Sequence, residues 1–183
     1  MEREEALVNL KENLKNENLV KHCIAVEAGM EELAEYFDED IEEWSLAGLL
    51  HDIDYESTQD NPERHSLVGA EILEDLGLSE EIVYAVKVHN EIHGLPRKSK
   101  MDKALYSVDP LTGLIVAATL IHPDKKLEAV DVEFVMNRFD ETSFARGANR
   151  EQIRACNELG LELEEFIELV LKGMQSKSDE LGL

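Results

Sequence analysis

Apolar residues recur every three or four positions along most of this chain, and this spacing constrains the fold more than any other feature of the sequence. The clearest stripe consists of Leu19, Cys23, Val26, Met30, Leu33 and Phe37. Such steps place apolar side chains on one face of an α-helix. Strict alternation, which is typical of half-buried strands, is scarce. The spacing therefore predicts an all-α fold.

Capping residues and helix breakers divide the chain into predicted helices. Asp40, with Glu43 three positions later, predicts a helix start. Asn61 before Pro62 predicts another start, with proline in the first helical position. That helix is expected to end near Leu76, before a glycine.

The second half of the chain shows the same organisation. Ser79 is predicted to cap a helix that runs to Gly94, and a long helix is expected over residues 101–121. Further helices fit residues 131–138, 148–158 and 162–175. An N-terminal helix around Leu10 covers either the chain's own core or a partner's. We expect one helical bundle of about eight or nine helices over residues 1–183.

Composition limits the partners of this fold. The chain has 183 residues, 43% of them apolar, which suits one compact domain. Its formal charge of -23 argues against long nucleic acid or an anionic membrane as partner. Cys23 and Cys156 do not resemble a disulfide framework, and no signal peptide is apparent, so a cytoplasmic location is expected. The longest apolar stretch, Leu111–Ile121, is about half of a membrane span.

The charge is unevenly distributed along the chain. Residues 1–60 carry 18 acids and 4 bases, whereas residues 61–120 carry 9 acids and 6 bases. This middle third contains a basic cluster of Arg97, Lys98, Lys100 and Lys103. The cluster is either a solvated surface segment or a rim that attracts phosphate.

Four of the six histidines lie beside apolar stripes: His22, His51, His65 and His89. A single such histidine is usually a hydrogen-bonded core residue, but four in one small domain need many buried partners. Asp52 follows His51 after an apolar run, and an unpaired buried carboxylate is costly. Asp109 lies in a similar apolar setting, although Asp109 before Pro110 also fits a helix N-cap.

These residue types together favour a metal site. Imidazole nitrogens with carboxylate oxygens suit Fe, Mn, Co, Ni or Zn. No thiolate belongs to the set, which argues against a structural zinc site. Sites of this kind with open positions are used for hydrolysis.

The order of these residues, a histidine, a His-Asp pair and a distant aspartate, resembles the H…HD…D signature of the HD-domain superfamily of metal-dependent phosphohydrolases. Three segments are similar to sequences of that family: LAGLLHDID at 46–54, HSLVGAEIL at 65–73 and HNE at 89–91. The similarity covers residues 18–122, and the helices of 123–183 are expected to pack on that core. The extra histidines resemble those of members with two metals.

The resemblance implies two sets of metal ligands. The first consists of His22, His51, Asp52 and Asp109. The second consists of His65, His89 and Asp52, with Asp52 bridging. Two divalent metal ions are therefore expected, Fe or Mn before Co, Ni or Zn, the first site being better supported than the second.

The chain also departs from the family pattern. Asp54 stands where the family has glycine, Tyr55 replaces the lysine common in signalling phosphodiesterases, and Asn90 replaces the second histidine of the HHE segment. These changes weigh against a cyclic-di-GMP phosphodiesterase. His93 is either an extra ligand or substrate contact, or a polar residue at a helix C-terminus.

With phosphate as the implied substrate group, further residues become candidates. The substrate-binding candidates are Arg97, Lys98, Lys100, Lys103, Arg146 and Arg150, and ordinary surface residues are the alternative. Asp52 and Asp109 are the catalytic candidates, Asp109 by orienting water. Glu91 is a candidate for proton transfer or a surface glutamate.

The function implied by the resemblance is hydrolysis of a nucleotide or another small phosphate ester, monoester or diester, by a metal-activated water. The alternatives are a diiron oxygenase on the same scaffold and a non-catalytic metal- or ligand-binding module. The sequence leaves open whether the protein is a monomer or a homodimer.

Overall fold

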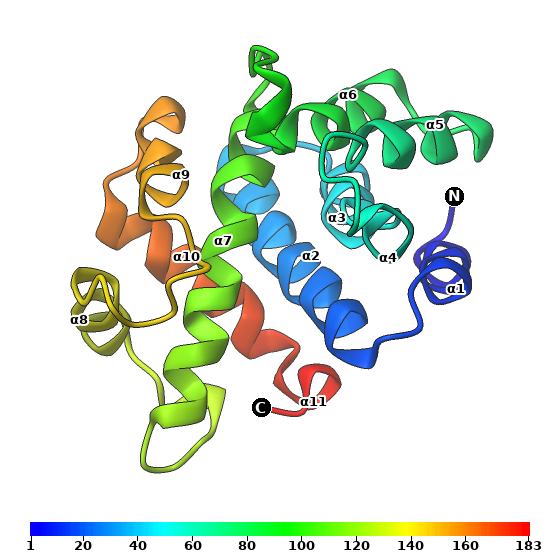
Figure 1. Cartoon of the computed structure of the whole chain (residues 1–183). Helices are drawn as coiled ribbons and strands as arrows, with labels where there is room; N and C mark the ends of the chain where they lie inside the picture. The colour runs from blue at the N-terminus through cyan, green and yellow to red at the C-terminus, as the bar shows by residue number, and fades with distance from the viewer.

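A computed structural model describes all 183 residues and contains only helices, turns and loops (Figure 1). The helices are α1 (Arg3–Asn13), α2 (Glu17–Phe37), α3 (Ile41–Leu50), α4 (Tyr55–Thr58), α5 (Leu67–Asp75), α6 (Glu80–His89), α7 (Lys100–Ile121), α8 (Val132–Asp140), α9 (Arg150–Arg154), α10 (Leu163–Ser176) and α11 (Ser178–Leu181). Three short 3-10 segments cover Glu91–His93, Leu127–Ala129 and Ala155–Leu159. Eight of the α-helices have nine or more residues. The all-α prediction is therefore confirmed.

Helix α2 is the central element, and it packs against α3, α7 and α10 (Figure 1). Small residues allow the closest approaches. A Cβ on Gly48 of α3 would lie 2.8 Å from the Cα of Glu27, and one on Gly173 of α10 would lie 2.2 Å from the carbonyl oxygen of Ala28. Neither glycine can be replaced without moving a helix, so α2, α3 and α10 have fixed positions relative to one another.

Two predicted helix starts are confirmed by their caps. The Asp40 side chain accepts a hydrogen bond from the Glu43 backbone N–H at the start of α3. The Ser79 side chain accepts one from Ile82 N–H at the start of α6. Both caps depend on neighbours within three residues, which is why the sequence shows them.

The predicted start at Asn61-Pro62 is wrong, because α5 begins at Leu67. Residues 59–66 form turns, and Ser66 has a left-handed backbone with φ of 69°. Its backbone N–H donates to the Asp54 carboxylate at 2.9 Å. This distant carboxylate holds the segment in a turn instead of a helix.

Three other expectations about the helices also differ from the structure. Helix α6 ends at His89 and not at Gly94, because Asn90 is extended and caps the following 3-10 turn. The N-cap interpretation of Asp109 is wrong, since Pro110 lies inside the continuous helix α7. Residues 148–158 form the short α9 and a 3-10 turn instead of one helix.

A single cluster of 45 buried hydrophobic residues runs from Ala6 in α1 to Leu181 in α11. Leu10 and Leu14 are fully buried in it, so the N-terminal helix covers the chain's own core. Helix α7 is long and apolar enough to span a membrane by length and composition, but 67% of that stretch is buried among the other helices. It is a core helix of the bundle.

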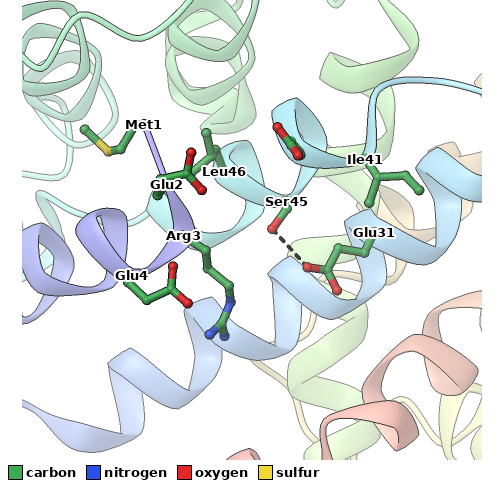
Figure 2. A pocket seen from close by; sticks show the side chains of 9 residues that line it. Met1, Glu2, Arg3, Glu4, Glu31, Ile41, Ser45 and Leu46 are labelled. Atoms are coloured by element: carbon green, nitrogen blue, oxygen red, sulfur yellow. Dashed lines mark hydrogen bonds between the residues drawn. The ribbon is translucent and has the colours of Figure 1, made fainter.

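A buried carboxylate links α1 to the C-terminal helices. Glu27 of α2 is fully buried, and Arg3 donates to both of its oxygens at 2.6 and 2.8 Å. Lys177 Nζ lies 3.1 Å from the same carboxylate, and Ser45 donates to it at 3.0 Å. Figure 2 shows the outer side of this network, where Arg3 and Ser45 line a surface hollow together with Glu31.

Candidate metal centre

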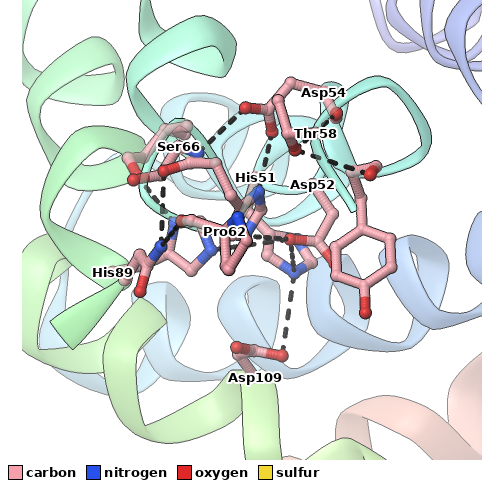
Figure 3. Close-up of polar contacts among 12 residues, drawn as sticks. His51, Asp52, Asp54, Thr58, Pro62, Ser66, His89 and Asp109 are labelled. Atoms are coloured by element: carbon pink, nitrogen blue, oxygen red, sulfur yellow. Dashed lines mark hydrogen bonds and ion pairs between the residues drawn. The ribbon is translucent and has the colours of Figure 1, made fainter. Parts of the chain in front are cut away.

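The fold brings all six predicted metal ligands to one place, beside the middle of α7. They are His22 in α2, His51 and Asp52 in the turn that ends α3, His65 in the turn before α5, His89 at the end of α6, and Asp109 in α7. Figure 3 labels four of them, His51, Asp52, His89 and Asp109. Five segments that are distant in sequence thus contribute to one cluster.

Asp52 lies at the centre of the cluster. Its Oδ1 is 3.5 Å from His51 Nε2, 3.3 Å from His65 Nε2 and 3.5 Å from His89 Nε2. Its Oδ2 is 3.8 Å from His22 Nε2. One carboxylate therefore faces four imidazoles, which is the position of a bridging ligand.

Asp109 completes a second group of ligand atoms on the other side. Its Oδ1 lies 3.0 Å from His22 Nε2 and 3.7 Å from His51 Nε2. The ligand atoms form two sets, and within each set all atoms lie within 4.8 Å of one another. The sets are His22, His51 and Asp109, and His51, Asp52 and His89. The two sets share His51, so two metal positions would be adjacent.

Backbone carbonyls fix the orientation of the buried histidines. His51 Nδ1 donates to Gly48 O at 2.8 Å, and His89 Nδ1 donates to Val86 O at 2.6 Å. A carbonyl only accepts, so Nδ1 carries the proton and Nε2 is left to face the cluster. His51 Nε2 is fully buried and has no hydrogen-bond partner. An orphaned buried nitrogen of this kind fits a metal ligand.

Asp54 orients His65, a role that was not predicted from the sequence. It is buried, and its Oδ1 lies 3.0 Å from His65 Nδ1 while its Oδ2 accepts from Ser66 N–H. The departure from glycine at this position thus places a carboxylate against His65 Nδ1. The signal in the sequence for this role was a carboxylate two residues after the His-Asp pair, in an apolar run. Gly69 leaves room for it, since a Cβ there would lie 3.2 Å from Asp54 Oδ1.

His93 and Asn90 support the turn that carries His65. His93 Nε2 donates to His65 O at 2.8 Å, and Asn90 Nδ2 donates to the same carbonyl at 3.3 Å. His93 thus holds the backbone of a ligand, and the structure does not place it in the cluster itself.

Residues 19–130 of the chain match the HD domain family. The match covers more than half of the chain and includes all six clustered residues. The chain belongs to the HD-domain family. The resemblance in its motifs is thereby confirmed, and the family is one of metal-dependent phosphohydrolases.

Several relatives of this HD domain share part or most of its length. An uncharacterized protein of Methanocaldococcus jannaschii is 33% identical over 149 residues, 77% of this chain and 86% of that protein. Ribonuclease Y of Nitratidesulfovibrio vulgaris is 29% identical over 141 residues, 74% of this chain but 26% of that protein. Ribonuclease Y of Lawsonia intracellularis is 34% identical over 80 residues, 44% of this chain and 15% of that protein. The chain thus spans about a quarter or less of these ribonucleases.

The charges in the HD-domain cluster raise the pKa values of its histidines His51 and His65 and lower the pKa of Asp52. Burial lowers the pKa of His51, but Asp52 and Asp109 outweigh it and raise this pKa to about 9. Burial likewise opposes the hydrogen bonds of Asp52 and Asp54 to His65, which raise its pKa to about 10. Burial favours protonated Asp52, yet the imidazoles hold its pKa well below the usual range. Without metal, the positive charges of protonated His51 and His65 balance these ionised carboxylates.

Metal binding is therefore expected to release protons. At pH 7.5 the metal-free chain carries protons on His51 and His65, whose pKa values lie at about 9 and about 10, and a metal displaces them. Calorimetric titration with Mn²⁺ in two buffers of different ionisation enthalpy measures this release. The apparent enthalpy should differ between buffers at pH 7.5 and the affinity should rise with pH. Identical heats in both buffers would contradict the protonated metal-free state.

The predicted basic cluster is largely occupied by other contacts. Arg97 forms an ion pair with Glu158 at 2.5 Å and stacks on the Tyr106 ring. Lys100 pairs with Glu39 at 2.7 Å. Among the six predicted substrate-binding residues, those without an acidic partner are Lys98, Lys103, Arg146 and Arg150.

Arg150 has a structural role that its sequence context did not reveal. Its guanidinium donates to six backbone carbonyls of residues 138–148, at distances from 2.7 to 3.4 Å. A guanidinium has five N–H donors, so none is left for a phosphate. The expectation that Arg150 binds substrate is wrong, whereas the exposed Arg146 retains its donors.

Glu91 lies apart from the six ligands. Its Oε2 accepts a hydrogen bond from the Tyr106 hydroxyl at 3.1 Å. Tyr106 is one turn before Asp109 in α7, and the guanidinium of Arg97 stacks on its ring. A catalytic role for Glu91 stays a prediction.

An open hollow of about 300 Å³ borders the ligands His22 and Asp109. Its other walls are Pro110 and Gly113 of α7 and the turn formed by Ala145, Gly147 and Ala148. Arg146 belongs to the same turn. The ligands of the first set are therefore accessible from solvent, as a hydrolytic site requires.

Proposed function

We propose that this HD-domain protein hydrolyses a nucleotide or another small phosphate ester with the help of divalent metal ions. One observation carries the proposal: four imidazole Nε2 atoms and two carboxylates converge beside an open hollow. Since buried polar atoms usually have a hydrogen-bond partner, the absence of one at His51 Nε2 favours a metal ligand over a purely structural cluster.

We assign the residues to two ligand sets that share Asp52, and we add His65, 3.3 Å from Asp52, to the second of the geometric groups in place of His51. The first metal would be held by His22, His51, Asp52 and Asp109. The second would be held by His65 and His89, with Asp52 shared. Such metals acidify water and stabilise charge on phosphoryl oxygens. The donors suit Fe and Mn, and also Co, Ni or Zn.

The rest of the chain limits the substrate. Asp109 reaches the hollow and can orient a water molecule there. Arg146 is exposed between Ala145 and Gly147, which line the same hollow, and we assign its guanidinium to a phosphate oxygen. The net charge of -23 opposes a long polyanion but leaves room for a small anion near local cations. We therefore propose that the substrate is a small phosphorylated molecule. We also propose that the protein has no membrane or long nucleic acid as a partner and that it is located in the cytoplasm.

RNA cleavage is the second candidate, because the similarity to ribonuclease Y extends over 141 residues. RNA cleavage requires attack on a phosphodiester, whereas the first candidate function allows either a phosphomonoester or a phosphodiester as substrate. The two candidates share the metal centre and differ in the surface needed to bind an extended strand.

The test is a hydrolysis assay on the full chain loaded with Mn²⁺ or Fe²⁺. We expect turnover on some members of a panel of nucleotides and small phosphoesters, and none after chelation. A single-stranded RNA oligonucleotide in the same panel tests the second candidate. Absence of turnover on every substrate with both metals would overturn the proposed function.

A further inference from the structure

Gly113 is exposed in the middle of α7, a 22-residue helix, and no packing contact explains it. Glycine is a poor helix former, and interior glycines are usually kept where another backbone approaches closely. A Cβ built on Gly113 meets nothing within 4 Å. The open space above this residue is therefore available to something outside the chain.

The position of Gly113 connects it to the metal centre. It follows Asp109 by four residues, and Val116 and Leu120 continue the same helix face. At the rise of an α-helix, Gly113 lies about 6 Å and Leu120 about 16 Å along the axis from Asp109. The face thus leads away from the metal ligands along the surface.

Two hollows meet at Gly113 and His22. One is the hollow of about 300 Å³ beside Asp109. The other has about 440 Å³ and lies between the first turns of α2, the second half of α7 and α11. Both are lined by Gly113 and by His22, so the two hollows adjoin at these residues, and together we call them the groove.

The second hollow has an unusual lining for so acidic a chain. No Asp or Glu side chain lines it, although 41 of the 183 residues are acidic. Its apolar walls are Val116, Leu120, Leu181 and Leu183. Leu120 is 55% exposed, and Lys21 at the edge forms no ion pair with any carboxylate. An apolar hollow with one free cation suits an organic group attached to an anion.

We propose that this groove is the specificity site of the enzyme: the phosphate lies at the metal centre, and an apolar or aromatic organic group of the ester crosses Gly113 into the hollow of α2, α7 and α11. The inference rests on the proposed function, since it requires a phosphate at the metal ligands. Gly113 leaves the passage open, and Lys21 favours substrates with further negative charge. The substrate class is thus a phosphate ester with a compact apolar group close to phosphorus.

The test compares two phosphonates that cannot be hydrolysed, methylphosphonate and 1-naphthylmethylphosphonate, by calorimetric titration of the Mn²⁺-loaded full chain. Burial of the naphthyl group should make its binding at least about tenfold tighter. If neither phosphonate binds, the proposed function itself fails. If both bind equally well, the function stands and the groove is overturned.

Two variants at one position sharpen the test. Gly113→Leu fills the passage and should reduce the preference for the naphthyl probe to within about twofold while methylphosphonate binds as before. Gly113→Ala is the intermediate case, because its Cβ meets no atom of the chain within 4 Å and adds a single methyl group to the passage. It should reduce the preference less than Gly113→Leu does and raise the melting temperature by about 2–4 °C through better helix propensity. Equal weakening of both probes by Gly113→Leu, or no change in the preference, would overturn the assignment.

Discussion

Replacing Asp52 with alanine is expected to abolish both metal binding and phosphoester hydrolysis. Oδ1 of this carboxylate faces His51, His65 and His89, and its Oδ2 faces His22, so one change affects every metal position. Loss of a bridging ligand should decrease turnover by at least about 10³-fold, as expected when metal catalysis is lost. Elemental analysis after dialysis and the hydrolysis assay measure the two effects.

Asp124→Ala is the matched control for this substitution. Asp124 also lies near a histidine, 3.9 Å from His122 Nδ1, but it is 69% exposed and outside the cluster. This variant should keep full metal content and turnover. Circular dichroism should show both variants folded, because the histidines that surround the Asp52 side chain can lose their protons and remain as neutral buried groups once it is removed. Retained activity in Asp52→Ala would exclude the proposed centre.

Replacing Glu27 with alanine is expected to destabilise the whole domain by about 3 kcal/mol. Glu27 is fully buried, and its removal leaves Arg3 and Lys177 without their buried partner. The value lies at the low end for a broken buried ion pair, because the side chain of Arg3 is 32% exposed and can recover hydration. Urea unfolding of the metal-free chain measures the difference.

Glu180→Ala provides the comparison, because Glu180 is the second carboxylate that Arg3 contacts, at 3.0 Å. Its side chain is 38% exposed, so its loss should change the unfolding free energy by less than about 1 kcal/mol. Equal destabilisation by the two variants would show that burial of Glu27 adds nothing to the network.

Features that depend on neighbours in sequence could be predicted. The apolar stripe of α2 and the caps at Asp40 and Ser79 need only residues within a few positions. The order of the histidines and aspartates also indicated which side chains meet, through the family that it resembles. The turn before α5 could not be predicted, since it depends on Asp54 binding Ser66 N–H twelve residues away.

The basic residues show the same limit of prediction from the sequence. Arg150 beside a predicted helix start has the local features of an anion site. Its donors are taken by carbonyls of the preceding turn, an arrangement that only the folded backbone creates. Arg97 similarly meets Glu158, 61 residues away. A charge in the sequence indicates a potential partner for phosphate, but the tertiary contacts decide whether it is free.

The location of His65 on a turn has a consequence for how the proposed two-metal centre would exchange its ions. His22 and Asp109 lie within the two longest helices, whereas His65 is held by Asp54, Asn90 and His93 next to a strained residue. Local opening of a turn requires much less free energy than unfolding of a core helix. A chelator should therefore remove the metal at His65 and His89 first, with biphasic kinetics, and the protein would spend part of its time in a state with a single metal whenever supply is short.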